Sequence, residues 1–189
     1  TIHYDSIIDR FDSVVGETLT SSSYYGENII YEEESGERTQ IELVFATATE
    51  PEQEAYLNLT HLPEGGTINE GILNGIKLYA NKYCRDNNLF PKNLKSFSDV
   101  DIEQSISFVA VVLSNNVEFQ NQTKFSTAKK LYFEIAKRRT QQALEVMEIE
   151  DNKGFKALID HLLLVQKDNT SNQKQKEKLK KKLKEKVDN

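Results

Sequence analysis

The stretch ISFVAVVLS (residues 106–114) is the most hydrophobic run in the chain. It is rich in β-branched and aromatic side chains, which favour a strand, and apolar residues fill both of its alternating faces. We therefore expect a strand that is covered on both faces. The polar stretch EFQNQTKFS (118–126) follows it, so this buried strand leads into a loop that presents one lysine, Lys124, among amides and a hydroxyl.

The segments before this run predict the rest of a sheet. Residues 28–34 and 38–48 flank the turn ESGE, and their alternation is typical of a β-hairpin. Residues 54–62 alternate again, which predicts a third strand of the same sheet. Residues 4–15 have apolar side chains at helical spacing and predict a short amphipathic helix.

Helices are predicted on both sides of the buried strand. Thr67 follows the sequence PEGG and stands three residues before Glu70, so we expect a capping box there and a helix that ends near residues 87–88. Residues 98–104 predict a short helical turn capped by Ser98.

The C-terminal third of the chain is predicted to be helical. One helix is expected over residues 128–148, with Ser126 as its cap, and another over 155–166. The polar residues 167–175 interrupt the apolar pattern. The lysine-rich end could then be either a folded helix or a frayed one, because its regular apolar positions form only the narrow stripe Leu179, Leu183 and Val187. Strands and helices thus mix without strict alternation, which predicts an α+β fold: a mostly antiparallel sheet with helices on one face.

Composition places the chain among water-soluble globular proteins. It has 189 residues, 38% hydrophobic and 29% charged, and no apolar run of membrane-spanning length. It has one cysteine, Cys84, which we expect to be a buried apolar residue in a protein from a reducing, cytoplasmic environment. Because the chain begins with Thr1 and not with Met, we expect either a fragment of a longer protein or a processed chain.

Charge is distributed unevenly along the chain. Residues 1–100 carry 7 basic and 17 acidic side chains, whereas residues 101–189 carry 17 basic and 13 acidic ones. The basic excess lies in KQKEKLKKKLKEK (174–186), which would attract a polyanion.

Two short stretches are candidates for chemistry. In PEGGT (63–67), paired glycines free the backbone at the start of a helix, although Gly-Gly alone is usually a plain turn. In QTK (122–124), a lysine beside an amide could hold a phosphate, although a surface lysine is usually only solvated.

Together, these two stretches resemble the transducer domain of type IIA DNA topoisomerases, as found in gyrase B, topoisomerase IV and phage enzymes. The resemblance is carried by LNLTHLPEGGTINEGILNGIKLYA (57–80) and SFVAVVLSNNVEFQNQTK (107–124), in that order, and it covers about residues 4–150. It implies a left-handed βαβ unit of the kind seen in domain 2 of a ribosomal protein, followed by long C-terminal helices. Residues 1–150 would form the transducer, and residues 151–189 would be an extension toward a DNA-cleavage region.

The resemblance also implies roles for individual residues. Lys124 would contact the γ-phosphate of ATP held by a preceding nucleotide-binding domain, assisted by Gln122 and Thr123. A cation and an amide donor can stabilise charge on a terminal phosphate, and losing that phosphate removes the contact. The lysine-rich segment would either be a solubilising linker or contact DNA phosphates. The lysines that would make this contact are Lys174, Lys176, Lys178, Lys180, Lys181, Lys182 and Lys184.

The same resemblance implies partners and cofactors outside this chain. ATP and Mg²⁺ would be needed by the longer protein, while this part alone would hold neither and would be inactive. Partners would be the nucleotide-binding domain, the DNA-cleavage region, DNA and a second topoisomerase subunit, with no membrane, and the part alone is expected to be monomeric. The chain departs from the family where Ile68 replaces a usual histidine, where Val117 replaces a frequent proline, and in DIEQSI (101–106), which lacks an expected Arg and Gly.

The histidines and the second basic run are also candidate site residues. The histidines His3, His61 and His161 do not cluster and no Cys/His ligand spacing is present, so we expect no metal site, and a local partner for His61. The basic run 137–139 is expected to be a solvated helix face, with a DNA contact as the alternative. Two alternatives to the topoisomerase remain open at this point: a stand-alone nucleic-acid-binding or scaffolding protein, and the equivalent domain of a mismatch-repair or chaperone ATPase.

Overall fold

A computed structural model describes residues 10, 11, 13, 23–24, 29–32, 38–58, 60–114, 126–127 and 130–187. The QTK loop and most of the predicted helix 4–15 lie outside these residues, although the backbone of Arg10, Phe11 and Ser13 is helical. The described elements are β1 (Ser23–Tyr24), β2 (Ile29–Glu32), β3 (Arg38–Thr47), β4 (Gln53–Leu57), β5 (Thr60–His61), β6 (Gly65–Gly66), α2 (Thr67–Asp86), α3 (Asp99–Glu103), β7 (Ile106–Ser114), β8 (Ser126–Thr127), α4 (Lys130–Glu150) and α5 (Asn152–Val187).

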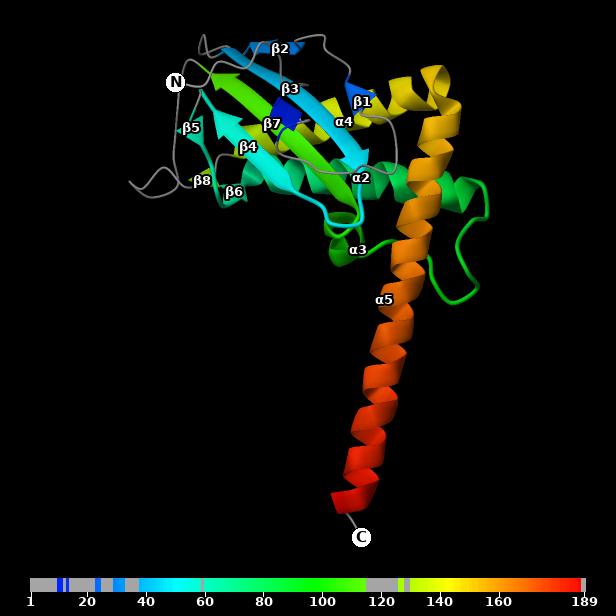
Figure 1. The fold of residues 1–189 in the computed structure, drawn as a ribbon. Coiled ribbons are helices and arrows are strands. Elements are labelled where there is room, and N and C mark those ends of the chain that lie inside the picture. Colours follow the sequence, from blue (N-terminus) through cyan, green and yellow to red (C-terminus); the bar gives the residue numbers. More distant parts are fainter. Residues whose placement is uncertain are drawn as a thin grey trace.

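The main sheet has the strand order β1-β3-β7-β4-β5, and β2 pairs with β3. All of its pairs are antiparallel except β4 and β7, which run parallel from Gln53 opposite Phe108 to Leu57 opposite Val112. The chain passes from β4 to β7 through α2, which makes the expected βαβ unit. The α+β class, the mostly antiparallel sheet and the long C-terminal helices are therefore confirmed (Figure 1).

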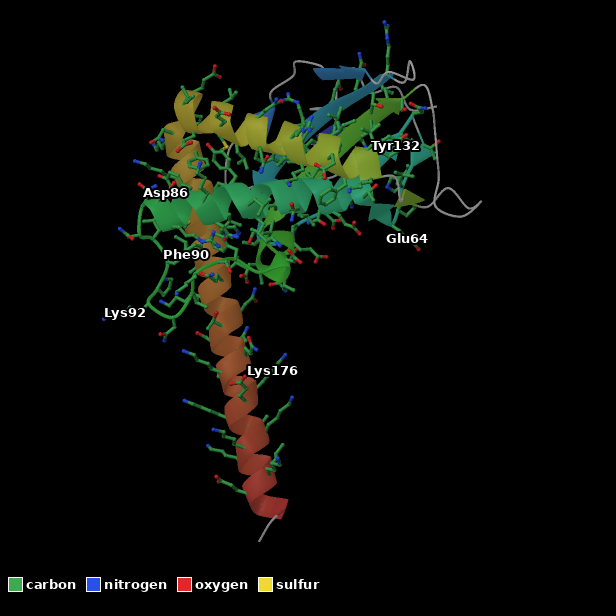
Figure 2. All side chains as sticks on the ribbon, turned by 180° about the vertical axis from the view of Figure 1, so that it is seen from behind. Glu64, Asp86, Phe90, Lys92, Tyr132 and Lys176 are labelled. Atoms are coloured by element: carbon green, nitrogen blue, oxygen red, sulfur yellow. The ribbon has the colours of Figure 1, made fainter. Side chains whose placement is uncertain are left out.

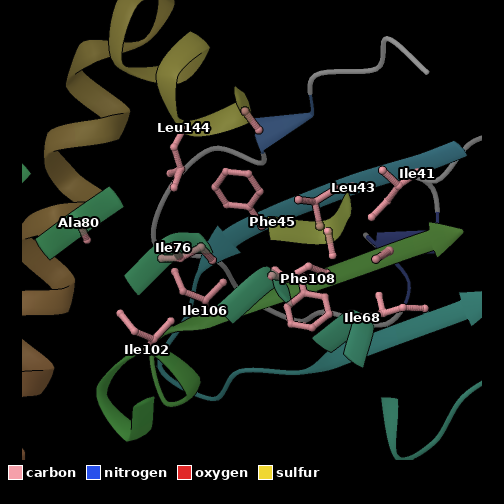
Figure 3. Packing of buried hydrophobic residues seen from close by; sticks show 14 of the residues in the cluster. Ile41, Leu43, Phe45, Ile68, Ile76, Ala80, Ile102, Ile106, Phe108 and Leu144 are labelled. Carbon is pink, nitrogen blue, oxygen red and sulfur yellow. The ribbon is translucent and has the colours of Figure 1, made fainter. Parts of the chain in front are cut away.

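The fold has two layers. Helices α2 and α4 lie side by side against one face of the sheet, as the view from behind shows (Figure 2). Between these layers lies the main core, to which β3 contributes Phe45, β7 contributes Phe108 and α2 contributes Ile76 (Figure 3). A smaller cluster on the opposite face joins Phe11 to Val109, so β7 is covered on both faces as predicted, although Leu113 near its end is 41% exposed.

Several sequence predictions match the observed elements closely. The run 106–114 coincides with β7, and the predicted hairpin is β2 and β3, with Glu32 opposite Arg38. Helix α3 begins at a capping box in which the Ser98 side chain accepts from the Asp101 backbone, and Asp101 reciprocates. Such a box satisfies backbone N–H groups that have no partner within the helix.

Two predicted helix caps were wrong. Thr67 is the first residue of α2 and not its cap, because Gly66 precedes the helix with φ 88° and ψ −136° and makes no side-chain cap. Ser126 does not cap α4, because Ser126 and Thr127 form the strand β8.

Two predicted element boundaries were also wrong. The strand expected at 54–62 is two strands, since Asn58 has φ 48° and turns the chain so that Leu57 faces Thr60. The polar segment 167–175 does not interrupt the C-terminal helix, because α5 continues from Asn152 to Val187.

Candidate functional site

The predicted phosphate-binding residues Gln122, Thr123 and Lys124 lie outside the described part of the chain. The structure does describe both ends of the loop that carries them. That loop leaves β7 at Ser114 and returns at β8. The site can therefore be built from its two supports.

The first support is the side chain of Asn58. Its Nδ2 donates to the Ser114 carbonyl at 2.7 Å, and its Oδ1 accepts from the Ser114 backbone N–H at 2.8 Å. The backbone N–H of Asn58 also donates to the Val112 carbonyl at 2.9 Å. A two-way amide contact of this kind is directional, so it fixes the end of β7 in position as well as in distance.

The second support is the paired-glycine turn. Gly65 pairs with Ser126 and Gly66 with Thr127, in parallel, so the PEGGT stretch lies directly beside the chain as it returns from the loop. Gly66 holds a backbone conformation that side chains with a Cβ rarely adopt, which explains the requirement for glycine there. Ile68, at the position where the resembled family usually has histidine, is fully buried in the main core.

The structure thus brings together the two stretches that carried the sequence resemblance. Asn58, Gly65 and Gly66 belong to one short segment that touches both ends of the loop. Asn58 was not among the residues predicted from the sequence. Its signal was an asparagine within an alternating strand, because asparagine tolerates a positive φ at turns.

The predicted DNA-binding lysines lie on the second half of α5, which extends beyond the body of the protein, as Lys176 shows (Figure 2). All seven side chains are exposed. Residues 171–187 carry eight lysines against two glutamates, a local charge of +6 in a chain whose net charge is −6. The extension leaves the body on the side where β7 begins, away from the loop supports (Figure 1).

A third polar cluster lies on the face of the sheet opposite α2 and α4. Glu54 is 5% exposed, and its Oε1 accepts from Arg10 Nη2 at 2.5 Å and from the Tyr56 hydroxyl. His61 Nε2 lies 3.9 Å from the same oxygen, and its ring packs on Tyr56 with centroids 5.2 Å apart, which is the local partner expected for His61. This cluster ties the N-terminal segment to the sheet. The period-two spacing of Glu54 and Tyr56 was its sequence signal.

The remaining candidates are structural. Cys84 is fully buried, and burial, with a smaller effect from Asp160, raises the pKa of its thiol to about 11, so it is not an activated nucleophile. Burial and the Glu148 carboxylate, which accepts from its hydroxyl, likewise raise the pKa of Tyr79. In the basic run 137–139, Arg138 is exposed as expected, but Arg139 is only 4% exposed, so that part of the prediction was wrong.

Two searches of the described residues gave no site. No group of three or more His, Cys, Asp or Glu side chains in the described ranges is arranged to hold a metal ion. None of the described helices is both long enough and apolar enough to span a membrane.

A family model described as DNA gyrase B matches residues 9–178. The DNA gyrase B protein of Metamycoplasma arthritidis is 27% identical over 113 residues, which are 60% of this chain and 18% of that protein. The DNA gyrase B protein of Streptococcus pneumoniae is 23% identical over 128 residues, 68% of this chain and 20% of that protein. The chain thus spans about a fifth of the length of these relatives.

Two solved structures share the fold. The 43K ATPase domain of Thermus thermophilus gyrase B, in complex with an aminocoumarin, superposes with a TM-score of 0.70 at 15% identity, covering 90% of this chain and 45% of that one. The ATP-binding domain of Francisella tularensis topoisomerase IV, in complex with a small-molecule inhibitor, gives a TM-score of 0.64 at 21% identity, covering 77% and 40%.

Proposed function

This chain belongs to the DNA gyrase B family, and we propose from this membership that it is the transducer of an ATP-dependent type II DNA topoisomerase. Residues 1–150 would be the transducer, and residues 151–189 the extension toward a DNA-cleavage region. The chain spans only part of its relatives, so the nucleotide-binding domain, a second subunit and the cleavage region are parts of the proposal. The match to gyrase B favours this function over a scaffolding protein or a mismatch-repair or chaperone ATPase.

In this proposal Lys124 contacts the γ-phosphate of ATP bound by the nucleotide-binding domain. Gln122 donates a second hydrogen bond, and Thr123 lies between them in the same loop. ATP supplies the phosphoryl group and Mg²⁺ its charge compensation. This chain supplies a cation and an amide on a loop held at both ends. A rigid support is what a phosphate sensor needs, because charge stabilisation works through donors that are already in position.

The single observation that supports the sensor best is the double anchoring of the loop. Asn58 holds Ser114 at one end, and Gly65 and Gly66 pair with β8 at the other. The buried strand β7 adds stiffness, because four of its side chains are in the main core. Loss of the γ-phosphate would remove the Lys124 contact, and the two domains would then rotate relative to each other.

ATP turnover by the longer protein tests this role. We expect Lys124→Ala to lower DNA-stimulated turnover by about 100-fold at ATP concentrations that keep the nucleotide bound, because a charge contact made in the transition state is lost. Lys130→Ala removes an exposed lysine at the start of α4 and serves as the matched control. Turnover that is equal in the two variants would refute the sensor role.

The lysine extension is the second part of the proposal. We propose that Lys174, Lys176, Lys178, Lys180, Lys181, Lys182 and Lys184 contact phosphates of a DNA duplex without reading its sequence. The exposure of all seven on a helix that leaves an otherwise acidic body supports this. Contacts of this kind release counterions, so with about five phosphates engaged the binding constant should fall with salt at a log–log slope of about −4 to −5.

Fluorescence anisotropy with a labelled duplex tests the DNA contact. Replacing the seven lysines by glutamine should abolish binding at low salt, and a duplex of different sequence should bind equally well. If the substituted chain binds as well as the original one, the extension is a solubilising linker instead.

A further inference from the structure

Two polar contacts hold α5 where it leaves the body of the protein. Leu162 is the last fully buried apolar side chain of the helix. One turn later, Gln166 is 2% exposed and its Nε2 donates to the Ser96 carbonyl at 2.9 Å. Asn169 Nδ2 then donates to Asp101 Oδ1 at 2.8 Å. Every described side chain from residue 171 to 186 is exposed, so these two amides are the last anchors of the helix within the described chain.

The partner of Asn169 is itself fixed in place. Asp101 is 4% exposed and closes the capping box of α3: its Oδ2 accepts from the Ser98 backbone at 2.9 Å. Its carbonyl also accepts from the Ser105 hydroxyl at 2.5 Å, one residue before β7 begins. Asp101 therefore joins α5 to α3 through its two carboxylate oxygens, which accept from Asn169 and from the Ser98 backbone. Its backbone carbonyl extends this connection to Ser105, next to the start of β7.

The same strand ends at the loop supports. Strand β7 pairs with β3 from Ile106 to Ser114 and, on its other side, with β4 from Phe108 to Val112. Asn58 fixes its far end. A continuous set of hydrogen-bonded elements thus connects the end of β7 that bears the loop with the base of the lysine extension.

We propose that Gln166 and Asn169 are positioning residues that set the direction of the lysine extension according to the position of β7. Apolar contacts hold the first turns of α5, but they are non-directional, whereas hydrogen bonds to a fixed carbonyl and a fixed carboxylate define the tilt and rotation of the helix. This inference deepens the proposed function and rests on it where ATP and DNA are concerned. Its geometric part concerns this chain alone.

Helix length makes the anchor important. From Leu162 to Val187 the helix rises about 38 Å, at ~1.5 Å per residue. A change in tilt of about 10° at its base would move the tip by about 6 to 7 Å on that rise. Such a displacement is comparable with the width of a DNA groove, so a small change at Asp101 would move the lysines relative to a bound duplex.

A distance measurement between spin labels tests the geometric part in this chain. Labels are placed at Arg138→Cys on α4 and Lys180→Cys on the extension, since both side chains are exposed and Cys84 is fully buried. We expect one narrow distance distribution in the parent chain. With Asn169→Ala and Gln166→Ala combined, it should broaden or shift by about 5 Å, as the tilt estimate implies.

A control variant and a replacement variant accompany the spin-label measurement. Asn172→Ala changes an exposed amide on the same helix and should leave the distribution unchanged. If the double variant unfolds, the single variant Asn169→Ala replaces it, because that side chain is partly exposed and alanine favours the helix. An unchanged distribution in a folded variant overturns the proposal, because apolar contacts alone would then direct α5.

Coupling in the longer protein tests the functional part. We expect Asn169→Ala to leave ATP turnover within about twofold but to lower strand passage per ATP at least fivefold, since this variant does not touch the loop supports. Equal ratios in parent and variant would overturn the coupling role. Failure of the proposed function looks different: Lys124→Ala would then leave turnover unchanged, whatever the spin labels report.

Discussion

Replacing Gly71 by alanine should destabilise the protein, although alanine is the better helix former. Gly71 and Gly75 are both buried on the face of α2 that meets α4. A Cβ added at Gly71 would lie 2.4 Å from the Phe133 carbonyl oxygen and 2.9 Å from Ala136 Cβ. Backbone cannot rotate away as a flexible side chain can, so the two helices would have to separate by nearly 1 Å.

The magnitude follows from two opposing effects. Overpacking costs about 3 kcal/mol when the obstacle is backbone, near the upper end of the usual range. Alanine returns about 1 kcal/mol of helix propensity relative to glycine. The expected net loss is about 2 kcal/mol, or about 4 to 8 °C in Tm for a chain of this size.

Gly75→Ala is the matched control. Its added Cβ would lie 2.9 Å from the Lys137 carbonyl oxygen and 3.1 Å from Thr140 Cβ, which requires a smaller adjustment. We expect a change in stability of less than about 1 kcal/mol, because propensity nearly offsets the strain. Urea unfolding followed by circular dichroism at the helical minimum measures both variants. If Gly71→Ala is more stable than the parent, propensity dominates and the close α2–α4 contact is not a constraint.

Three further predictions address other parts of the fold. Gly66→Ala should lower the free energy of unfolding, measured in urea, by about 1 to 3 kcal/mol, because residue 66 holds φ 88° and ψ −136°. An unchanged urea midpoint would show that alanine is not strained at this position. Arg10→Met should lower the free energy of unfolding by about 2 kcal/mol, less than for a fully buried pair because the Arg10 side chain is 26% exposed. Adding Glu54→Gln should recover part of this loss, because the carboxylate left without Arg10 is then removed. If stability does not recover, the unpaired carboxylate is not the cause. Burial raises the pKa of Cys84 from 9.0 to about 11, so the stability that the buried thiol contributes is complete below pH 9 and is lost as the pH rises toward 11. Between these pH values the parent should lose up to about 2 to 3 kcal/mol more unfolding free energy than Cys84→Ser. Identical pH profiles of the two proteins would refute this prediction.

Strong local signals allowed much of the fold to be predicted. The bounds of β7 were predictable because its apolar run is long and uninterrupted, and the cap of α3 because Ser98 and Asp101 have the spacing of a capping box. The break at Asn58 was not predictable from alternation. It depends on one residue with a positive φ whose side chain is satisfied by Ser114, more than fifty residues away in sequence.

Long-range contacts also explain the other differences. Gly66 precedes α2 because its pairing with Thr127 sets its backbone, a contact that local sequence cannot reveal. The polar residues 167–175 remain helical because amides at the start of this segment are anchored: Gln166 donates to the Ser96 carbonyl, and Asn169 donates to Asp101 in α3. For the candidate site, the two motifs were identified from the sequence. The structure adds the pairing of Gly65 and Gly66 with Ser126 and Thr127, and the contact of Asn58 with Ser114.

Nucleotide affinity tests the central claim most directly: that Lys124 senses the γ-phosphate. Calorimetric titration of the longer protein with a non-hydrolysable ATP analogue and with ADP would measure both affinities for parent and Lys124→Ala. We predict that Lys124→Ala weakens binding of the ATP analogue by about tenfold or more, the value of one charge-assisted contact, and leaves ADP binding unchanged. Equal weakening for both nucleotides, or for neither, would contradict it.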